Sequence, residues 1–323
     1  MQGWRAQFRS RGAARPAISL ALAALAASSL AIWAPAAATG RADQSAPTAG
    51  GRDAPTASAR LLFCDEFDNL DLWNGTSGVW DTSYYWQRKP NGSTLPNEGE
   101  WYLNANFGPT SQVKPWTVAD GALTLTASRT PAAIAAYAEG HAFVSGMLNS
   151  GHGLHQLYGY FELRAKLPRG QGLWPAFWLA PADGSASHEI DVMEVLGQQP
   201  RALHTTLHTF VGGHVAQTHV AQVADMTDGF HLYGVDWQSD RITWYFDRRP
   251  VFRADTPPGL HKPVFMILDL AVGGPMPGPA DATTPSPARF VVDYIRIYSA
   301  PPTDAPQAAV AADAPCRSRR GDG

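Results

Sequence analysis

Short segments in which apolar and polar residues alternate recur along this chain from residue 121 onward, and they restrict the fold more than any other feature. Such alternation, bounded by turn residues, is typical of β-strands that bury one face. On this basis we expect strands at residues 121–127, 159–166, 230–237, 241–246 and 290–298.

Turn composition supports the same interpretation. Ser239-Asp240 and Asp247-Arg248-Arg249-Pro250 lie between neighbouring predicted strands and have the residue types of tight turns. No long segment shows a sustained helical period, and no internal repeat is visible. Many short strands joined by turns predict an all-β fold, a sandwich of two antiparallel sheets, in one domain at residues 60–299.

The two ends of the chain differ from this domain in composition. Four arginines precede an apolar run at residues 17–33, and Ala36-Ala37-Ala38 offers a small-residue cleavage site. This order is typical of a secretory signal peptide, which we place at residues 1–38; a membrane anchor is the alternative, for which the run is short. Residues 39–59 and 300–323 are rich in small residues and proline, so we expect a disordered linker and a disordered tail.

Charge and cysteine content restrict the partners. The net charge is −3, and removing the four leader arginines leaves about −7. An acidic secreted protein is a poor candidate for binding nucleic acid, whereas a neutral polysaccharide is compatible with it. We expect a monomer with no membrane attachment after cleavage. Cys64 and Cys316, the only two cysteines, either pair across the domain or remain two thiols.

The segment Glu189-Ile190-Asp191-Val192-Met193-Glu194 places three carboxylates within six residues of an apolar stretch. Its β-branched neighbours predict a strand, and buried like charges cost free energy, so folding alone does not explain these acids. Two carboxyl groups facing each other across a cleft are what hydrolysis of a glycosidic bond requires. A solvated strand face with scattered acids is the alternative.

In a regular strand Glu189 and Asp191 share one face, and Glu194 points to the other. One inserted residue would bring Glu194 back to the same face. Bulges that re-aim a side chain in this way occur next to active sites. We therefore predict a β-bulge around Val192-Met193.

The acidic segment resembles the signature of glycoside hydrolase family 16, in its bulged, laminarinase-like branch. Further segments in the same order are similar to that family: Tyr158-Gly159-Tyr160-Phe161-Glu162, residues 172–179, Tyr233-Gly234-Val235-Asp236-Trp237, residues 267–274 and residues 292–298. The resemblance implies a β-jelly-roll with a concave substrate cleft and a retaining mechanism. It also implies that Glu189 is the nucleophile, Glu194 the general acid/base, and Asp191 the assisting carboxylate.

Several residues are candidates for binding substrate. Trp174 and Trp178, four residues apart on one strand face, resemble the family's sugar-stacking residues; core packing is the alternative. His208 resembles a cleft histidine near the acid/base, or is a satisfied structural histidine. Two tryptophans in polar, loop-like stretches, Trp86 and Trp101, are expected at the rim of the cleft. Arg164 either faces the cleft or is solvated.

The resemblance implies one candidate cofactor, and the sequence departs from the family's pattern at two positions. Asp293 and the residues near Asp65-Glu66 resemble a structural calcium site that some family members carry away from the cleft, although an acidic turn explains the same residues. No cofactor is expected to be required for the reaction. His188 stands where many relatives have a small residue, and Asp269 where relatives often have Asn.

The function that these observations favour is a secreted endo-β-glycanase acting on β-1,3- or β-1,3-1,4-linked glucan or on a bacterial exopolysaccharide. A non-catalytic glucan-binding protein is an alternative, but such relatives have lost the catalytic acids, and Glu189 and Glu194 are both present. A transglycosylase on the same fold is a third possibility, although those relatives resemble an unbulged spacing that is one residue shorter.

Overall fold

The computed structural model describes residues 59–302 apart from 85, 87 and 88. In this part of the chain the helical segments are two 3₁₀ turns, η2 (Gly108–Thr110) and η3 (Ala132–Tyr137), and strands make up the rest of the regular structure. The all-β prediction is therefore confirmed. The predicted signal peptide, nearly all of the linker and most of the tail lie outside the described residues. None of the described helical segments has the length and apolar character needed to cross a membrane.

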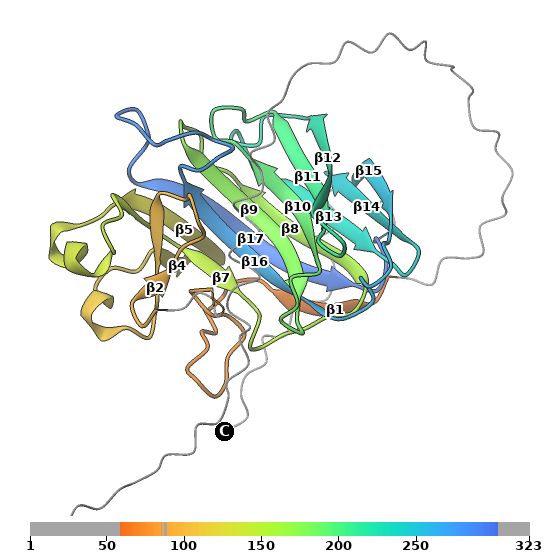
Figure 1. The fold of residues 1–323 in the computed structure, drawn as a ribbon, viewed down its shortest axis with the longest axis horizontal. Coiled ribbons are helices and arrows are strands. Elements are labelled where there is room, and N and C mark those ends of the chain that lie inside the picture. Colours follow the sequence, from red (N-terminus) through yellow and green to blue (C-terminus); the bar gives the residue numbers. More distant parts are fainter. Residues whose placement is uncertain (1–58, 85, 87–88, 303–323) are drawn as a thin grey trace, which may run out of the picture.

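The larger of two sheets contains, among the described residues, β1 (Leu61–Asp65), β2 (Gly92–Ser93), β3 (Glu100–Leu103), β4 (Trp116–Ala119), β5 (Ala122–Arg129), β6 (Phe143–Ser145), β8 (Gly159–Lys166), β13 (His231–Trp237), β14 (Arg241–Phe246), β15 (Arg249–Asp255) and β17 (Ala288–Tyr298). Its strand order is β15-β14-β13-β8-β17-β5-β6-β3-β2, with β1 pairing with β17 and β4 with β5. Figure 1 shows β8 and β17 as long neighbours in the middle of this sheet.

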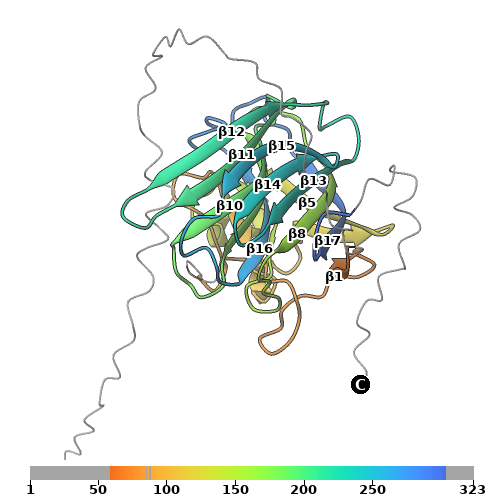
Figure 2. The ribbon, with the colours of Figure 1, turned by 90° about the vertical axis from the view of Figure 1, so that its right-hand side faces the viewer.

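The smaller sheet contains β7 (Met147–Asn149), β9 (Leu173–Pro181), β10 (His188–Val195), β11 (Ala202–Thr209), β12 (Val215–Gln222) and β16 (Val264–Val272). The order is β12-β11-β10-β9-β16-β7, and each neighbouring pair is antiparallel. In Figure 2, β12 and β11 lie on one side of the domain next to β10.

One face of the smaller sheet packs against the larger sheet and forms the core. The fully buried side chains of Phe161 on β8, Phe177 on β9, Ile190 on β10, Leu268 on β16 and Ile295 on β17 belong to the same hydrophobic cluster. Side chains alternate along a strand, so the neighbours of these residues on β9, β10 and β16 point to the opposite face of the sheet. That opposite face holds the site described below.

The structure confirms the predicted strands and shortens one predicted turn. β8 and β14 have the predicted bounds. Between β14 and β15 only Asp247 and Arg248 form the turn, both with positive φ (47° and 60°), as in the two-residue turns that match strand twist. Arg249 and Pro250 already belong to β15. Proline is tolerated there because β15 is an edge strand.

Candidate active site

Strand β10 carries the three carboxylates and is irregular where the sequence predicts it. Towards β9, Asp191 pairs with Trp178 but Met193 pairs with the next residue, Phe177, so β10 has one residue in excess. Towards β11 the register also shifts between Asp191 and Glu194. The predicted β-bulge is confirmed. It turns Glu194 towards the face of Glu189 and Asp191, and all three line one pocket.

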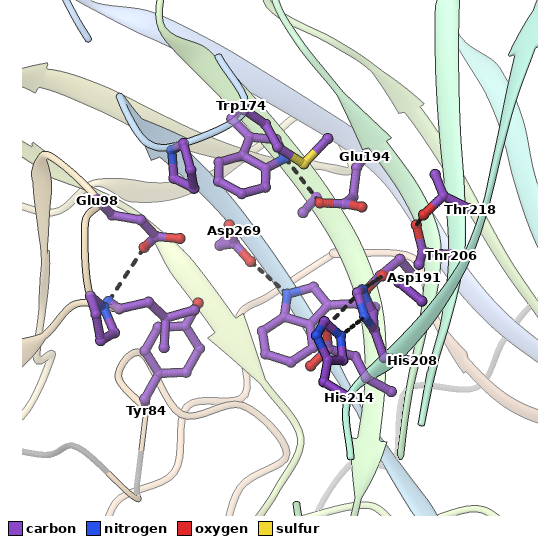
Figure 3. Close-up of a pocket in the computed structure, with 18 of the residues that line it drawn as sticks. Tyr84, Glu98, Trp174, Asp191, Glu194, Thr206, His208, His214, Thr218 and Asp269 are labelled. Atoms are coloured by element: carbon purple, nitrogen blue, oxygen red, sulfur yellow. Dashed lines mark hydrogen bonds and ion pairs between the residues drawn. The ribbon is translucent and has the colours of Figure 1, made fainter. Parts of the chain in front are cut away.

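The pocket has a volume of about 470 Å³ and lies on the free face of the smaller sheet. The catalytic candidates of β10 lie in its middle. Figure 3 shows Tyr84 and Glu98 on one side of them. On the other side it shows a group from β11, β12 and the residue before β12: Thr206, His208, His214 and Thr218. The pocket therefore extends across β10 in both directions.

Burial governs the protonation of Glu189 and Asp191. Loss of solvation, reinforced by the Asp191 charge, raises the pKa of Glu189 to about 8, and His208 opposes this rise. Burial likewise raises the pKa of Asp191 to about 8. The two carboxyl groups share a hydrogen bond. They therefore titrate as a pair in which one group keeps a proton while the other carries the charge.

Glu194 is held mainly in its protonated form. Burial raises its pKa well above the usual range, and the charges of Asp191 and Glu189 act in the same direction. A hydrogen bond of 3.1 Å from Trp174 Nε1 to Glu194 Oε1 favours the ionised form and opposes this shift. The site thus combines a proton donor with a carboxyl pair that carries a negative charge.

His208 lies one strand along from the carboxylates, as expected. It is on β11, directly opposite Glu189 in the register. Its Nε2 lies 3.0 Å from Asp191 Oδ2 and 3.8 Å from Glu189 Oε1. The interpretation as a cleft histidine is therefore supported by its contacts.

Trp174 and Trp178 both line the pocket from β9. Trp178 donates from Nε1 to Asp269 Oδ1 at 2.8 Å, while Trp174 donates to Glu194. Each indole nitrogen is thus bound to a carboxylate of the pocket. Stacking of a sugar on their rings remains a prediction.

The two tryptophans expected at the rim have different positions. Trp86 lines the pocket and packs against Trp178 and Phe265. The expectation for Trp101 is wrong, because it is only 4% exposed, belongs to the main core and donates from Nε1 to the Asn91 carbonyl. Its neighbour on β3, Tyr102, points towards the cleft side and donates to Asp269 Oδ2 at 3.2 Å.

Arg164 does not face the pocket, so its assignment to substrate binding is wrong. It lies on β8 in the larger sheet, pairs with Asp293 on β17 and sits over the Phe230 ring. An ion pair across two neighbouring strands explains the residue without substrate.

The same ion pair bears on the predicted calcium site. Asp293 is bound by Arg164, and both Glu66 oxygens are bound by Arg296 at 2.8 and 3.1 Å. Asp65 accepts hydrogen bonds from Trp80 Nε1 and the Phe67 amide. A calcium ion at these residues would have to displace both guanidinium groups, and its presence remains a prediction. Cys64, next to them on β1, is disulfide-bonded, whereas Cys316 lies outside the described residues.

Asp269 lies between the carboxyl groups of β10 and a second group of acids, Glu98 and Glu100, and burial together with charges from both groups raises its pKa. Burial raises its pKa to about 8, and the Glu98 charge contributes. Burial raises the pKa of Glu98 well above its usual value, and a hydrogen bond with Glu100 contributes. Burial also raises the pKa of Glu100 to about 7. Asp269 is thus held by two donors, Trp178 and Tyr102.

Several pocket residues were missed from the sequence. They are Tyr84, Leu95, Pro96, Glu98, Ala176, Thr206, Phe210, His214, Ala216, Thr218, Pro275 and Met276. Those on β11 could have been found from His208, since every second residue of a strand shares its face. The residues on loops before β3 and after β16 carry no periodic pattern that would have indicated them.

Within residues 59–302, excluding the three that are not described, one group of side chains has the spacing of metal ligands: Glu189, Asp191 and His208 lie within 4.8 Å of one another. These groups already bond to one another as hydrogen-bond and ion-pair partners. We therefore interpret them as catalytic groups.

The chain belongs to glycosyl hydrolases family 16, whose sequence profile matches residues 103–296. It is 45% identical over 241 residues to the endo-1,3-1,4-beta-glycanase EglC of Rhizobium meliloti (strain 1021), covering 73% of this chain and 51% of that protein. It is 31% identical over 261 residues to the beta-glucanase of Rhodothermus marinus, covering 74% of this chain and 84% of that protein. The resemblance inferred from the motifs is thus confirmed.

Solved structures agree with this assignment. The endo-beta-1,3-glucanase from Pyrococcus furiosus superimposes with a TM-score of 0.60 at 32% identity, over 75% of this chain and 94% of that one. The jelly-roll prediction is confirmed by this likeness and by the two-sheet sandwich. The chain spans about half the length of EglC.

Proposed function

We propose that this chain is a secreted, retaining endo-β-glycanase that hydrolyses β-1,3- or β-1,3-1,4-linked glucan, or a bacterial exopolysaccharide with such linkages. The observation that carries the proposal is the bulge in β10, which brings Glu189, Asp191 and Glu194 to one pocket. The family membership and the names of the relatives agree with it.

The arrangement suits double displacement. Glu189 attacks the anomeric carbon while protonated Glu194 gives its proton to the leaving oxygen; Glu194 then takes a proton from the water that releases the sugar. This requires the two carboxyl groups about 5–5.5 Å apart. Asp191 binds Glu189 and faces His208, so it orients the nucleophile and keeps a charge on the pair.

The shape and charge of the pocket favour an internal segment of a neutral polymer. Side chains line it on both sides of β10, so a chain could continue beyond the cleaved bond in both directions. Five carboxyl groups line it, Glu98, Glu189, Asp191, Glu194 and Asp269, and no Lys or Arg is among its described lining residues. The negative charge that the Glu189–Asp191 pair keeps would repel acidic substituents close to the cleaved bond.

Product analysis tests the activity. The purified mature chain is incubated with laminarin, mixed-linkage β-glucan, succinoglycan and xyloglucan, with Glu189→Ala and Glu194→Ala as controls. We expect internal cleavage of at least one polymer, absent in both variants, and a β-configured first product by proton NMR. An α-configured first product would exclude retention.

Two outcomes favour the alternatives. Binding of a polymer without cleavage would favour a glucan-binding protein. Oligosaccharide transfer to added acceptors in preference to water would favour a transglycosylase. Secretion is tested separately, by N-terminal sequencing of the exported protein: a mature start near residue 39 is expected, and a retained leader would contradict it.

A further inference from the structure

The hairpin formed by β11 and β12 brings two imidazoles into contact beside the carboxylates. Six alternating residues of this hairpin line the pocket: Thr206 and His208 on β11, Ala216 and Thr218 on β12, and Phe210 and His214 directly beside the two strands, in the connection between them. The register places Ala216 directly opposite His208, so His214 is the diagonal neighbour of His208. The small Ala216 side chain leaves room for His214 Nε2 to approach His208 Nδ1 to 2.8 Å.

The turn before β12 holds His214 in this place. Gly212 and Gly213 have φ angles of 78° and 126°, which favour glycine, and the Gly213 amide donates to the Phe210 carbonyl at 3.4 Å. The Phe210 ring is nearly parallel to both imidazoles, with centroids 4.7 Å from His214 and 5.9 Å from His208. His214 is therefore packed as well as hydrogen-bonded.

The proton arrangement follows from the partners of the two nitrogens of His208. The hydrogen bond that Asp191 shares with Glu189 lowers the pKa of Asp191 and raises that of Glu189, so Asp191 is the ionised member of the pair. His208 Nε2 lies 3.0 Å from Asp191 Oδ2, and an ionised carboxylate carries no hydrogen, so the nitrogen that faces it at this distance carries the hydrogen. In neutral His208 the other nitrogen, Nδ1, is then an acceptor, and it needs a donor. His214 Nε2 is in position to be that donor.

We propose that His214 is a positioning residue for the reaction: its Nε2–H fixes His208 in the tautomer whose Nε2–H faces Asp191. This rests on the proposed function, because the carboxylates that it serves are the ones assigned there. Burial and the charge of His208 lower the pKa of His214, which favours its neutral form.

The consequence concerns the ionisation of Glu189. The titratable groups that face the Glu189–Asp191 pair are His208, Glu194, Asp269 and Tyr84. An Nε2–H of His208 that faces Asp191 favours the ionised form of the pair. If His208 could turn its lone pair towards Asp191, the pair would hold its proton to higher pH.

Two variants distinguish the effect of the His214 N–H donor from the effect of its aromatic ring. His214→Phe keeps a ring beside Phe210 and removes the donor, whereas His214→Gln keeps an N–H donor and removes the ring. In His214→Phe we expect the acidic limb of the kcat/KM profile to shift to higher pH by about half a pH unit. At pH values below that limb, kcat/KM should then be about threefold lower than in the wild type. His214→Gln should keep the wild-type limb. An unmoved limb in His214→Phe, or equal shifts in both variants, would overturn the proposal.

A readout independent of activity is ¹⁵N NMR of the His208 ring. We expect the Nε2–H tautomer in the wild type and in His214→Gln, and a mixture of tautomers in His214→Phe. An identical tautomer in all three proteins would refute the positioning role. If the wild type cleaves no glycan, the proposed function fails, and the NMR result still decides whether His214 sets the His208 tautomer.

Discussion

The indole Nε1 of Trp174 donates a hydrogen bond of 3.1 Å to Oε1 of Glu194, the proposed general acid/base. This bond favours the ionised carboxylate, whereas burial and the neighbouring acids favour the protonated form. Double displacement needs both forms in turn, first the acid and then the base. The Trp174 bond therefore keeps the second step accessible.

We expect Trp174→Phe to retain a flat apolar ring and to lose this bond. The pKa of Glu194 should then rise further, so that the basic limb of the kcat profile moves to higher pH and kcat near pH 7 falls about tenfold. The measurement is a pH profile of kcat on the polymer that the wild type cleaves. A lower kcat with an unmoved limb would show that Trp174 acts on substrate and not on Glu194.

Glu194→Gln should be inactive but more stable than the wild type. The pKa of Glu194 is raised from 4.5 on folding, so its stabilising contribution is complete below pH 4.5 and is lost as the pH rises through the folded-state pKa. A neutral amide avoids this loss. The free energy of unfolding should exceed the wild-type value by about 1 kcal/mol or more at pH 7.

Urea unfolding at pH 4 and pH 7 measures this difference. The two proteins should be closely similar at pH 4. A constant difference at both pH values would mean that packing, and not ionisation, separates them.

His188 should make the fold sensitive to acid. It is 2% exposed, and neither ring nitrogen has a hydrogen-bond partner among the described residues. Burial, and then the charge of His261, lower its pKa below 6.5, so its neutral form is favoured by folding. Stability is therefore unaffected above pH 6.5 and falls as the pH drops below it.

His188→Leu should reduce this fall and raise the unfolding free energy by about 1 kcal/mol at neutral pH, because an unpaired buried polar group is removed. Thermal unfolding at pH 7.5 and pH 5 is the test, with exposed His155→Leu as the control. A stability gap between His188→Leu and the wild type that does not widen at pH 5 would contradict the assignment.

Arg248 should be essential for the stability of the larger sheet. It binds both oxygens of the fully buried Glu162 at 2.9 Å, and Tyr160 and Tyr294 donate to the same carboxylate at 3.0 Å. Arg248→Met leaves a buried charge without its cation, which costs about 3–5 kcal/mol. Chemical denaturation of the single variant and of the double variant Arg248→Met/Glu162→Gln measures this cost. No recovery in the double variant would count against a charge effect.

The sequence predicted the strands better than it predicted which face of each strand meets the cleft. Alternation predicted β8 and β14 with their observed bounds. Alternation does not tell which sheet a strand joins. Arg164 lies in the larger sheet, away from the pocket, and on β3 Tyr102 instead of Trp101 points to Asp269.

The candidate site was predictable where the chemistry dictated the geometry. Three carboxylates that act together must share a face, and that requirement predicted the bulge at Val192-Met193 from the spacing alone. His214 could not be found in this way. Its contact with His208 depends on a two-glycine turn and on the small side chain of Ala216, neither of which is a periodic pattern.

Because of the bulge, the loss of one residue would change the spacing between the two catalytic glutamates. Glu189 and Glu194 are five residues apart, and the odd number is tolerated only because β10 has one residue in excess. Removing that single residue would leave four, and a regular strand then places both glutamates and Asp191 on the same face. A single in-frame deletion could thus exchange the bulged form of this strand for the straight one while all three carboxylates remain facing the substrate.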